Sequence, residues 1–385
     1  MLKTQVIKLK VNQTMQTHLD ELCDYRRYCW NKGLETWQAM YEAHTLNSED
    51  NPSPNERRVR NELVANKEDW QYGLSARCLQ LAVKDLAQAW KNFLDQAQPD
   101  WGMPQFKPKK APRQGFKTDR AKIVNGKLRI DKPRNITKDA WFDLGSYETL
   151  KMAEVKVVSI FKENDTYYAA LPYEEKIEAK TKTQRKTAVD VNVGHFNYLG
   201  GQINILPARL KKLYQRIKHY QRVLAHKQVV NGKQAAQSNN YIKTRAKLQR
   251  DYRKIANVQN DLLQKFTTKL VDNYDQIIIE DLAVKEMMMS HVASKGMQRS
   301  LFSKFRQILT YKCEWYDKRL LLAPKTYPST QRCAQCGSVK QGEEKINLQG
   351  NQKHGTKHNE YVCYECGYVN DRDENAVLNL LALVK

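Results

Sequence analysis

The sequence predicts an α+β protein of several domains, and three features of its 385 residues support this fold class. Short stretches with alternating apolar residues, typical of strands, flank a long stretch with helical spacing in the first half of the chain. In the second half, helical patterns separate two apolar strands of the kind found in sheets that are covered on both faces. Four cysteines in two closely spaced pairs indicate a small metal-binding segment near the C-terminus.

The first twelve residues are expected to form a half-buried strand, because Ile7, Leu9 and Val11 fall on the same face. Residues 13–100 then show helical spacing of apolar residues, interrupted by one proline-containing loop. We expect these residues to form a small helical domain inserted after the first strand.

Residues 101–182 contain prolines and glycines that separate short alternating runs such as Val155–Ile160. We expect these runs to form a β-rich module that pairs with the first strand. A polar linker, Lys180–Lys186, leads into the next apolar run.

A helical hairpin is expected over residues 205–270. Leu210, Leu213 and Ile217 follow heptad-like spacing, and Val230-Asn231-Gly232 is expected to make the turn.

Most of the formal net charge of +23 lies in two stretches of the chain. Lys107–Lys138 carries a net charge of +10 and residues 205–270 carry +14, so the remainder is nearly neutral. Such basic stretches attract phosphate backbones and give salt-dependent binding. A solubilising surface or attraction to a membrane surface are the alternatives. The candidate nucleic-acid contacts are Lys107, Lys109, Lys110, Lys211, Arg216, Arg222, Arg250 and Lys254.

The predicted location is the cytoplasm, without a membrane partner, and the resemblance given below implies a prokaryotic cell and association with its nucleoid. The longest apolar runs are too short to cross a bilayer, and the N-terminal residues have no apolar signal region. The unpaired cysteines Cys23, Cys29, Cys78 and Cys313 lie among apolar or helical residues, as buried thiols of a reducing compartment do.

Two acids interrupt apolar strands. Asp190 lies inside the run Thr187–Val193, where a carboxylate is costly unless it is paired or binds a metal. Glu280 follows the apolar run Ile277–Ile279, and sites in α/β sheets form at the carboxyl ends of strands. For each acid alone, a role at a strand end or turn stays open.

A third acid, Asp373, lies where the last helix is expected to begin. There it would either cap the helix or complete a cation site with the two strand acids.

The paired cysteines are typical of zinc ligands. Cys333-x2-Cys336 and Cys363-x2-Cys366 are separated by 26 residues, and a glycine follows each pair. Two such pairs suit tetrahedral binding of one structural Zn²⁺ by four thiolates. A redox dithiol is the alternative for a single pair, and His354 or His358 could replace one cysteine ligand.

The order of these features resembles the TnpB family, which consists of RNA-guided DNA nucleases encoded by insertion sequences and similar to compact type V CRISPR effectors. The match covers residues 187–383 and includes Glu280-Asp281-Leu282 and Asp373-x-Asn375-Ala376. In the N-terminal half, Pro104-Gln105-Phe106-Lys107 is similar to a family motif. Two positions depart from the family pattern, since Asn192 replaces a usual glycine and Val377 a usual alanine.

The resemblance implies a division into four domains. These are a wedge β-barrel domain (1–12 and 101–182), a helical recognition domain (13–100), an RNase H-like RuvC nuclease domain (183–328 and 371–385), and an inserted four-cysteine zinc-binding domain (329–370).

The resemblance also implies a function. A guide RNA from the right-end element (omega RNA) would direct a single RuvC site to cut both strands of double-stranded DNA beside a transposon-adjacent motif, in support of transposon maintenance. We expect one protein chain per RNA. The catalytic acids would be Asp190, Glu280 and Asp373, with Asp373 chosen over Asp371 because the family acid immediately precedes x-Asn-Ala.

Three acids suit the expected chemistry, because two Mg²⁺ ions about 3.5–4 Å apart can activate water and neutralise phosphate oxygens. The alternatives are an RNA-guided repressor without nuclease activity and a strand-transferring transposase. Loss of a triad acid would favour the repressor, and all three are present.

Overall fold

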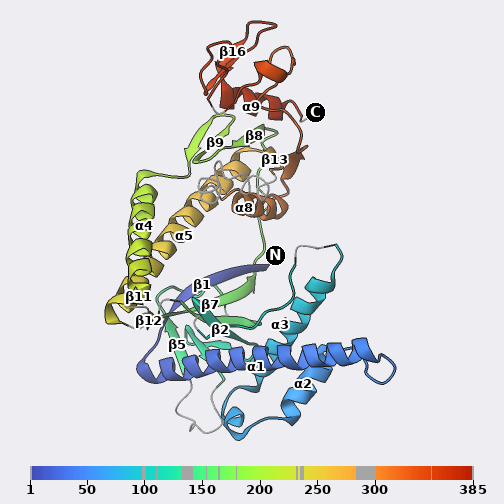
Figure 1. Ribbon diagram of the computed structural model, residues 1–385, viewed down its shortest axis with the longest axis vertical. Coiled ribbons are helices and arrows are strands. Elements are labelled where there is room, and N and C mark those ends of the chain that lie inside the picture. The colour runs from blue at the N-terminus through green and yellow to red at the C-terminus, as the bar shows by residue number, and fades with distance from the viewer. Residues whose placement is uncertain are drawn as a thin grey trace. The chain divides into compact units, whose positions relative to one another are not determined.

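The computed structural model describes residues 2–97, 101–109, 111–131, 142–152, 154–163, 165–178, 180–230, 233–234, 238–282, 301–347 and 349–383. The chain forms two compact units, Met1–Lys176 and Ile177–Lys385 (Figure 1). The finer division into four domains stays a prediction. Within the described ranges, no helix is both long and apolar enough to cross a membrane.

The first unit contains a curled antiparallel sheet of seven strands in the order β2-β6-β7-β1-β5-β4-β3. The first strand pairs with β7 along most of its length and with β5 at its end, which confirms its predicted pairing with the β-rich module. Among the described residues, the edge strands β2 and β3 do not pair with each other, so the predicted wedge β-barrel is present as a curled half-barrel. The strands are β1 (Leu2–Lys10), β2 (Arg113–Thr118), β3 (Lys122–Val124), β4 (Lys127–Ile130), β5 (Phe142–Ser146), β6 (Val158–Glu163) and β7 (Thr166–Glu174).

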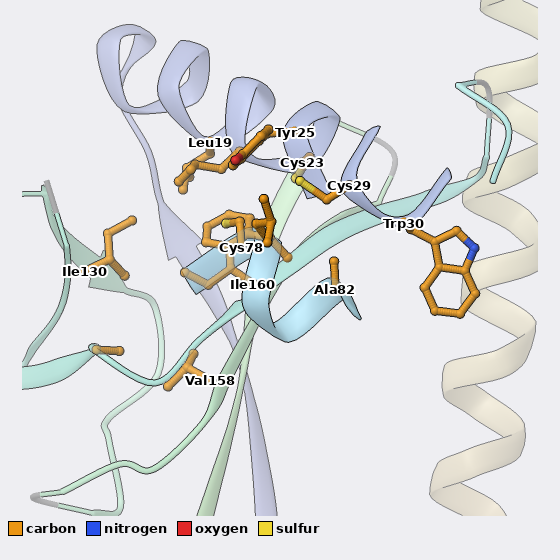
Figure 2. Packing of buried hydrophobic residues seen from close by; sticks show 14 of the residues in the cluster. Leu19, Cys23, Tyr25, Cys29, Trp30, Cys78, Ala82, Ile130, Val158 and Ile160 are labelled. Carbon is orange, nitrogen blue, oxygen red and sulfur yellow. The ribbon is translucent and has the colours of Figure 1, made fainter. Parts of the chain in front are cut away.

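The helices of this unit are α1 (Gln13–Leu46), α2 (Glu56–Ala65), α3 (Ala76–Leu94) and a short 3-10 helix, η1 (Asp69–Gly73). Side chains of Asn12, Asn55 and Ser75 cap the three α-helices by accepting backbone N–H hydrogen bonds. Helices α1 and α3 both pack against β2, and together they form one core with the sheet. Figure 2 shows cysteines of α1 and α3 inside this core, as predicted for buried thiols.

The second unit is built on a five-stranded sheet in the order β10-β9-β8-β13-β14. Strands β8, β13 and β14 are parallel, whereas β9 and β10 are antiparallel to their neighbours. The strands are β8 (Lys186–Val191), β9 (His195–Tyr198), β10 (Gly201–Asn204), β13 (Gln276–Glu280) and β14 (Arg319–Ala323).

Helices cover both faces of this sheet, as its apolar strands predicted. Val189 and Ile277 share a core with α5 (Asn239–Asn273) and α8 (Phe302–Trp315). The alternate residues Ala188 and Ile278 contact α9 (Arg372–Leu381) instead. Because side chains alternate along a strand, Asp190 and Glu280 belong to the face that α9 covers.

The predicted basic hairpin is formed by α4 (Ala208–Gln228) and α5. Leu210, Ile217 and Ile255 pack between the helices. Two short strands, β11 (Val229–Val230) and β12 (Lys233–Gln234), pair at its tip. The predicted turn residues 231–232 lie outside the described residues.

A small cysteine-containing segment connects β14 with α9. It includes the 3-10 helix η2 (Gly342–Glu344) and the paired strands β15 (Glu360–Val362) and β16 (Val369–Asp371). Its core consists of Cys333, Ile346, Tyr361 and Cys363.

Candidate active site and metal centre

Asp190 and Glu280 lie at the carboxyl ends of neighbouring parallel strands. In the register of β8 and β13, Val189 is opposite Ile279, so the two acids come directly after a paired position. Only 3% of the surface of Asp190 is exposed. The fold therefore brings two acids that are 90 positions apart in the sequence to the same edge and face of the sheet.

Asp373 reaches this edge from the first turn of α9. Its Oδ2 accepts a hydrogen bond from Asn197 Nδ2 at 2.8 Å and lies 3.1 Å from His195 Nε2. Asn197 is the cross-strand partner of Asp190 in the pairing of β8 with β9. Strand β9 therefore holds the Asp373 side chain beside the acidic end of β8.

The helix-capping role belongs to Asp371. Its Oδ1 accepts hydrogen bonds from the backbone N–H groups of Asp373 at 2.9 Å and Glu374 at 3.2 Å. The interpretation of Asp373 as the N-cap is therefore wrong. With its carboxylate turned toward β9, Asp373 is free of the cap and available to the acidic cluster.

The electrostatics of the cluster favour a bound cation. Burial, together with the nearby charges of Glu280 and Asp373, raises the pKa of Asp190 to about 8. Burial also raises the pKa of Glu280, although the Ser329 hydroxyl opposes this by donating a hydrogen bond of 2.6 Å to Glu280 Oε1. A cation would remove the repulsion among these acids.

The described residues contain one compact group of candidate metal ligands, and the three carboxylates do not belong to it. That group consists of the four cysteines, whose Sγ atoms all lie within 4.8 Å of one another. Carboxylate oxygens are ligands that Mg²⁺ prefers, and Mg²⁺ keeps several water or substrate oxygens in its coordination sphere. The residues present therefore fit Mg²⁺.

Sequence reasoning missed the polar partners of the acids. Asn192, which the sequence marks only as a departure from a family pattern, donates a hydrogen bond of 2.6 Å to Asp190 Oδ2. His195, Asn197 and Ser329 had no signal in the sequence, because their partners lie far away along the chain. Of these three residues, Asn197 alone could have been found from the sequence, by predicting that β8 pairs with β9 and places Asn197 opposite Asp190.

The four cysteines form the predicted metal site. The Sγ–Sγ distances are 3.7 Å for Cys333–Cys366 and 3.6 Å for Cys336–Cys363. A Zn²⁺ ion with bonds of about 2.3 Å to four sulfurs would place the sulfurs about 3.8 Å apart, whereas a disulfide would need about 2.05 Å. The arrangement fits a closed structural zinc site and excludes two disulfides in this state.

Each cysteine pair forms the same turn. The glycines after the pairs, Gly337 and Gly367, have φ of +80° and +73°, which favours glycine, and their N–H groups donate to the carbonyl oxygens of Cys333 and Cys363. His354 stacks on Tyr364 with ring centroids 3.8 Å apart and is outside the four-cysteine group.

Two buried asparagines of α9 attach the cysteine segment to the acidic cluster. Asn375 donates to the Arg332 carbonyl oxygen at 2.8 Å and accepts from the Ala334 N–H at 3.0 Å. Asn379 donates to the carbonyl oxygens of Ser329 and Arg332. The first cysteine turn thus holds the helix that carries Asp373.

The predicted nucleic-acid contacts belong to both units. In the first unit, Lys107 Nζ lies 3.5 Å from the centroid of the Trp30 ring, and Lys109 is exposed. Lys110 lies outside the described residues. In the second unit, the candidate cations are all exposed on the helical hairpin, namely Lys211, Arg216, Arg222, Arg250 and Lys254. Arg216 also pairs with the buried Asp251 at 3.0 Å.

The sheet, its acidic edge and the adjoining four-cysteine site define a class of α+β proteins in which two candidate metal centres adjoin one helix, α9. Two family models match the chain. The model described as "Probable transposase", OrfB_IS605, matches residues 170–291, and the model described as "Cas12f1-like, TNB domain" matches residues 302–380. The resemblance to the TnpB family that the motifs indicated is thereby confirmed.

Similar proteins carry consistent names. A Streptomyces pristinaespiralis protein named "Putative RNA-guided DNA endonuclease" is 26% identical over 308 residues, which cover 79% of this chain and 70% of that protein. An Escherichia coli K12 protein, "Putative RNA-guided DNA endonuclease InsQ", is 26% identical over 83% of this chain and 77% of its own length. A mimivirus protein named "TnpB-like protein L79" is 28% identical over 46% of this chain and 32% of its own length.

One similar solved structure is that of a "Cas12f1-sgRNA-target DNA complex", with a TM-score of 0.57 and 12% sequence identity. The match covers 96% of this chain and 83% of that chain, and it shows that the two share a fold.

Proposed function

We propose that the protein is an RNA-guided DNA endonuclease with one acidic active site in its second unit. The main support for this proposal is that Asp190, Glu280 and Asp373 lie together at one edge of the sheet. The names of the relatives supply the class of reaction. Bound Mg²⁺ would supply the activation of water and the charge for phosphate oxygens.

We assign the second unit to the RNase H-like, RuvC type. The strand order β10-β9-β8-β13-β14, with the acids on β8 and its parallel neighbour β13, supports this assignment. Within the site, Asn192 orients the Asp190 carboxylate and Ser329 orients Glu280. Asn197 and His195 hold Asp373, so each carboxylate has a fixed position before an ion binds.

The finer parts of the function are also proposals. The single site would cut both strands of double-stranded DNA next to a short transposon-adjacent motif, with one chain bound to one right-end-element RNA. Two Mg²⁺ ions would serve the reaction and one Zn²⁺ would be structural. The protein would act in the cytoplasm, and its activity would help to maintain a transposon.

The test uses the protein loaded with its copurifying RNA and a plasmid that carries the matching target and adjacent motif. Asp190→Ala, Glu280→Ala and Asp373→Ala are each expected to abolish Mg²⁺-dependent cutting of both strands, while gel-shift binding is retained. The effects should be non-additive because the acids serve one site. Asp371→Asn is the matched control and should cut, since asparagine also caps helices.

The outcomes separate the candidate functions. If all three alanine variants still cut, the nuclease assignment fails. If the wild-type protein binds the target without cutting it, the repressor is the better description. Joining of cleaved ends to a second DNA would instead indicate strand transfer.

A further inference from the structure

The first unit contains a basic cavity of about 400 Å³ that none of the catalytic residues uses. It lies among α1, the residues Lys107, Pro108 and Ala111, and strands β2 and β6. Its volume is within the range of ligand pockets, about 300–1,000 Å³. The lining contains no Asp or Glu and has five cationic residues, Arg26, Arg27, Lys107, Arg113 and Lys117.

Acids behind the lining offset only part of this charge. Asp85 pairs with Arg26 at 2.6 Å and with Lys117 at 2.7 Å, and Asp24 pairs with Arg27 at 3.2 Å. The other two cations, Lys107 and Arg113, contact aromatic rings, and within the described ranges neither forms an ion pair. A partner that enters the cavity would therefore meet excess positive charge, which suits a phosphate.

The pKa of Lys107 also indicates excess positive charge in the cavity. Burial lowers the pKa of Lys107 to about 8, and the positive charges of Arg26 and Lys117 contribute while Asp85 opposes them. An anion beside Lys107 would relieve this repulsion between cations.

The cavity also contains an exposed planar side chain, the guanidinium of Arg113. Arg113 lies 3.6 Å from the centroid of the Phe161 ring, which stacks in turn on Tyr168. Opposite Phe161 in the sheet is Gly115, where a Cβ atom would lie 2.7 Å from the Cβ of Phe161, so a side chain there would have to displace the strand. Aromatic rings and arginine planes are the surfaces on which unpaired RNA bases stack.

We propose that this cavity holds one unpaired nucleotide of the bound guide RNA, with its base against the Arg113 guanidinium, which Phe161 supports, and its phosphate beside Lys107 and Arg27. The inference rests on the proposed function, because it takes an RNA partner as given. RNA is favoured over duplex DNA because the bases of a duplex are stacked inside it, whereas an unpaired base of an RNA loop can enter a cavity.

The test measures the affinity of the full-length protein for its copurifying RNA, which is sequenced, transcribed and labelled. Ser159→Phe fills the cavity without changing charge, and Lys107→Met removes a cation at nearly constant length. Each should weaken RNA binding about tenfold, the effect expected from loss of a stacked base or a buried phosphate contact. The charge-matched control, Arg57→Gln on the exposed side of α2, should bind as the wild type does.

A chemical footprint of the RNA gives a second readout. One unpaired nucleotide should be protected by the wild-type protein and should become reactive with Ser159→Phe. Melting curves establish that each variant is folded, and Lys107→Met serves as the test if Ser159→Phe does not fold.

The inference is overturned if Ser159→Phe binds RNA and protects it as the wild type does, because the cations would then be only an electrostatic surface. It is also overturned if Ser159→Phe binds RNA with wild-type affinity but, when loaded with RNA, no longer binds target DNA. A wild-type protein that binds no RNA would instead contradict the proposed function itself. Ser159→Phe saturated with RNA should still cut DNA, since the acidic site is intact.

Discussion

At the residue scale, hydrogen bonds hold the three carboxylates of the acidic site in position. Asp190, Glu280 and Asp373 each accept a hydrogen bond from a different neighbouring side chain. These contacts orient the carboxylates, but they do not remove the cost of placing like charges together in a buried position. The ion-free protein should therefore be less stable than it would be with a neutral residue in place of one acid.

Asp190→Asn should make the ion-free protein more stable at alkaline pH. The pKa of Asp190 is raised from 3.8 to about 8, so the folded state holds a proton that the unfolded state has lost between about pH 4 and 8. The contribution of Asp190 to the free energy of unfolding is therefore present at low pH and is lost as the pH rises toward 8. The advantage of the variant over the wild type should grow by on the order of 4 kcal/mol between pH 5 and pH 8.

The measurement is urea unfolding at both pH values in buffer without added Mg²⁺, so that the zinc site stays intact. Asp371→Asn is the control, because it also neutralises an aspartate near the site but keeps the helix cap. If the free energy of unfolding changed equally with pH in Asp190→Asn and in the wild type, the raised pKa of Asp190 would be contradicted.

Asp371→Ala should destabilise the protein without abolishing cleavage. The substitution removes the acceptor for two backbone N–H groups at the start of α9 and should cost about 1 kcal/mol. Thermal unfolding and plasmid cleavage well below the midpoint measure the two effects separately. Loss of cleavage in a folded Asp371→Asn variant would instead make Asp371 a member of the active site.

At the element scale, the α4–α5 hairpin is a candidate nucleic-acid surface with an ion pair that links its two helices. Asp251 is only 1% exposed and pairs with Arg216, which connects the two helices. Arg216 therefore has a structural role in the hairpin, and its replacement would leave a buried carboxylate without this partner. The other candidate cations are better probes of binding.

Replacement of Lys211, Arg222, Arg250 and Lys254 by glutamine should weaken nucleic-acid binding and reduce its dependence on salt. Each lost phosphate contact lowers the slope of log affinity against log salt by about 0.9 for duplex DNA or about 0.7 for a single strand. Fluorescence anisotropy at several salt concentrations measures this slope. Arg216→Gln is the comparison variant and should lower the melting temperature. A slope identical to that of the wild type would show that these cations face solvent and contact no phosphate.

At the scale of the whole molecule, the zinc segment and the acidic site share helix α9. The cysteine turns fix the backbone around Arg332, and Asn375 and Asn379 attach α9 to it. Loss of zinc should therefore disturb Asp373 although no acid has changed.

We expect one tightly bound zinc per chain, and none after Cys363→Ser plus Cys366→Ser. That double variant should lose both stability and cleavage, because a closed thiolate site contributes directly to folding. Elemental analysis and plasmid cutting measure the two effects. Cys313→Ser, at a buried thiol outside the site, should keep its zinc. Full zinc content in the double variant would contradict the four-cysteine assignment.

Local patterns in the chain were sufficient to predict the α+β class, the basic hairpin, the four metal-binding cysteines and the strands on which Asp190 and Glu280 lie. These features follow from periodicity and spacing over a few residues, which side-chain alternation and helical geometry make readable. The open edge of the first sheet, the pairing of Arg216 with Asp251 and the basic cavity came from the tertiary structure. So did the contacts of Asn197 with Asp373 and of Ser329 with Glu280, which join residues 176 and 49 positions apart. Such contacts depend on strand register and on how α9 packs against the sheet, and no short stretch of sequence encodes either.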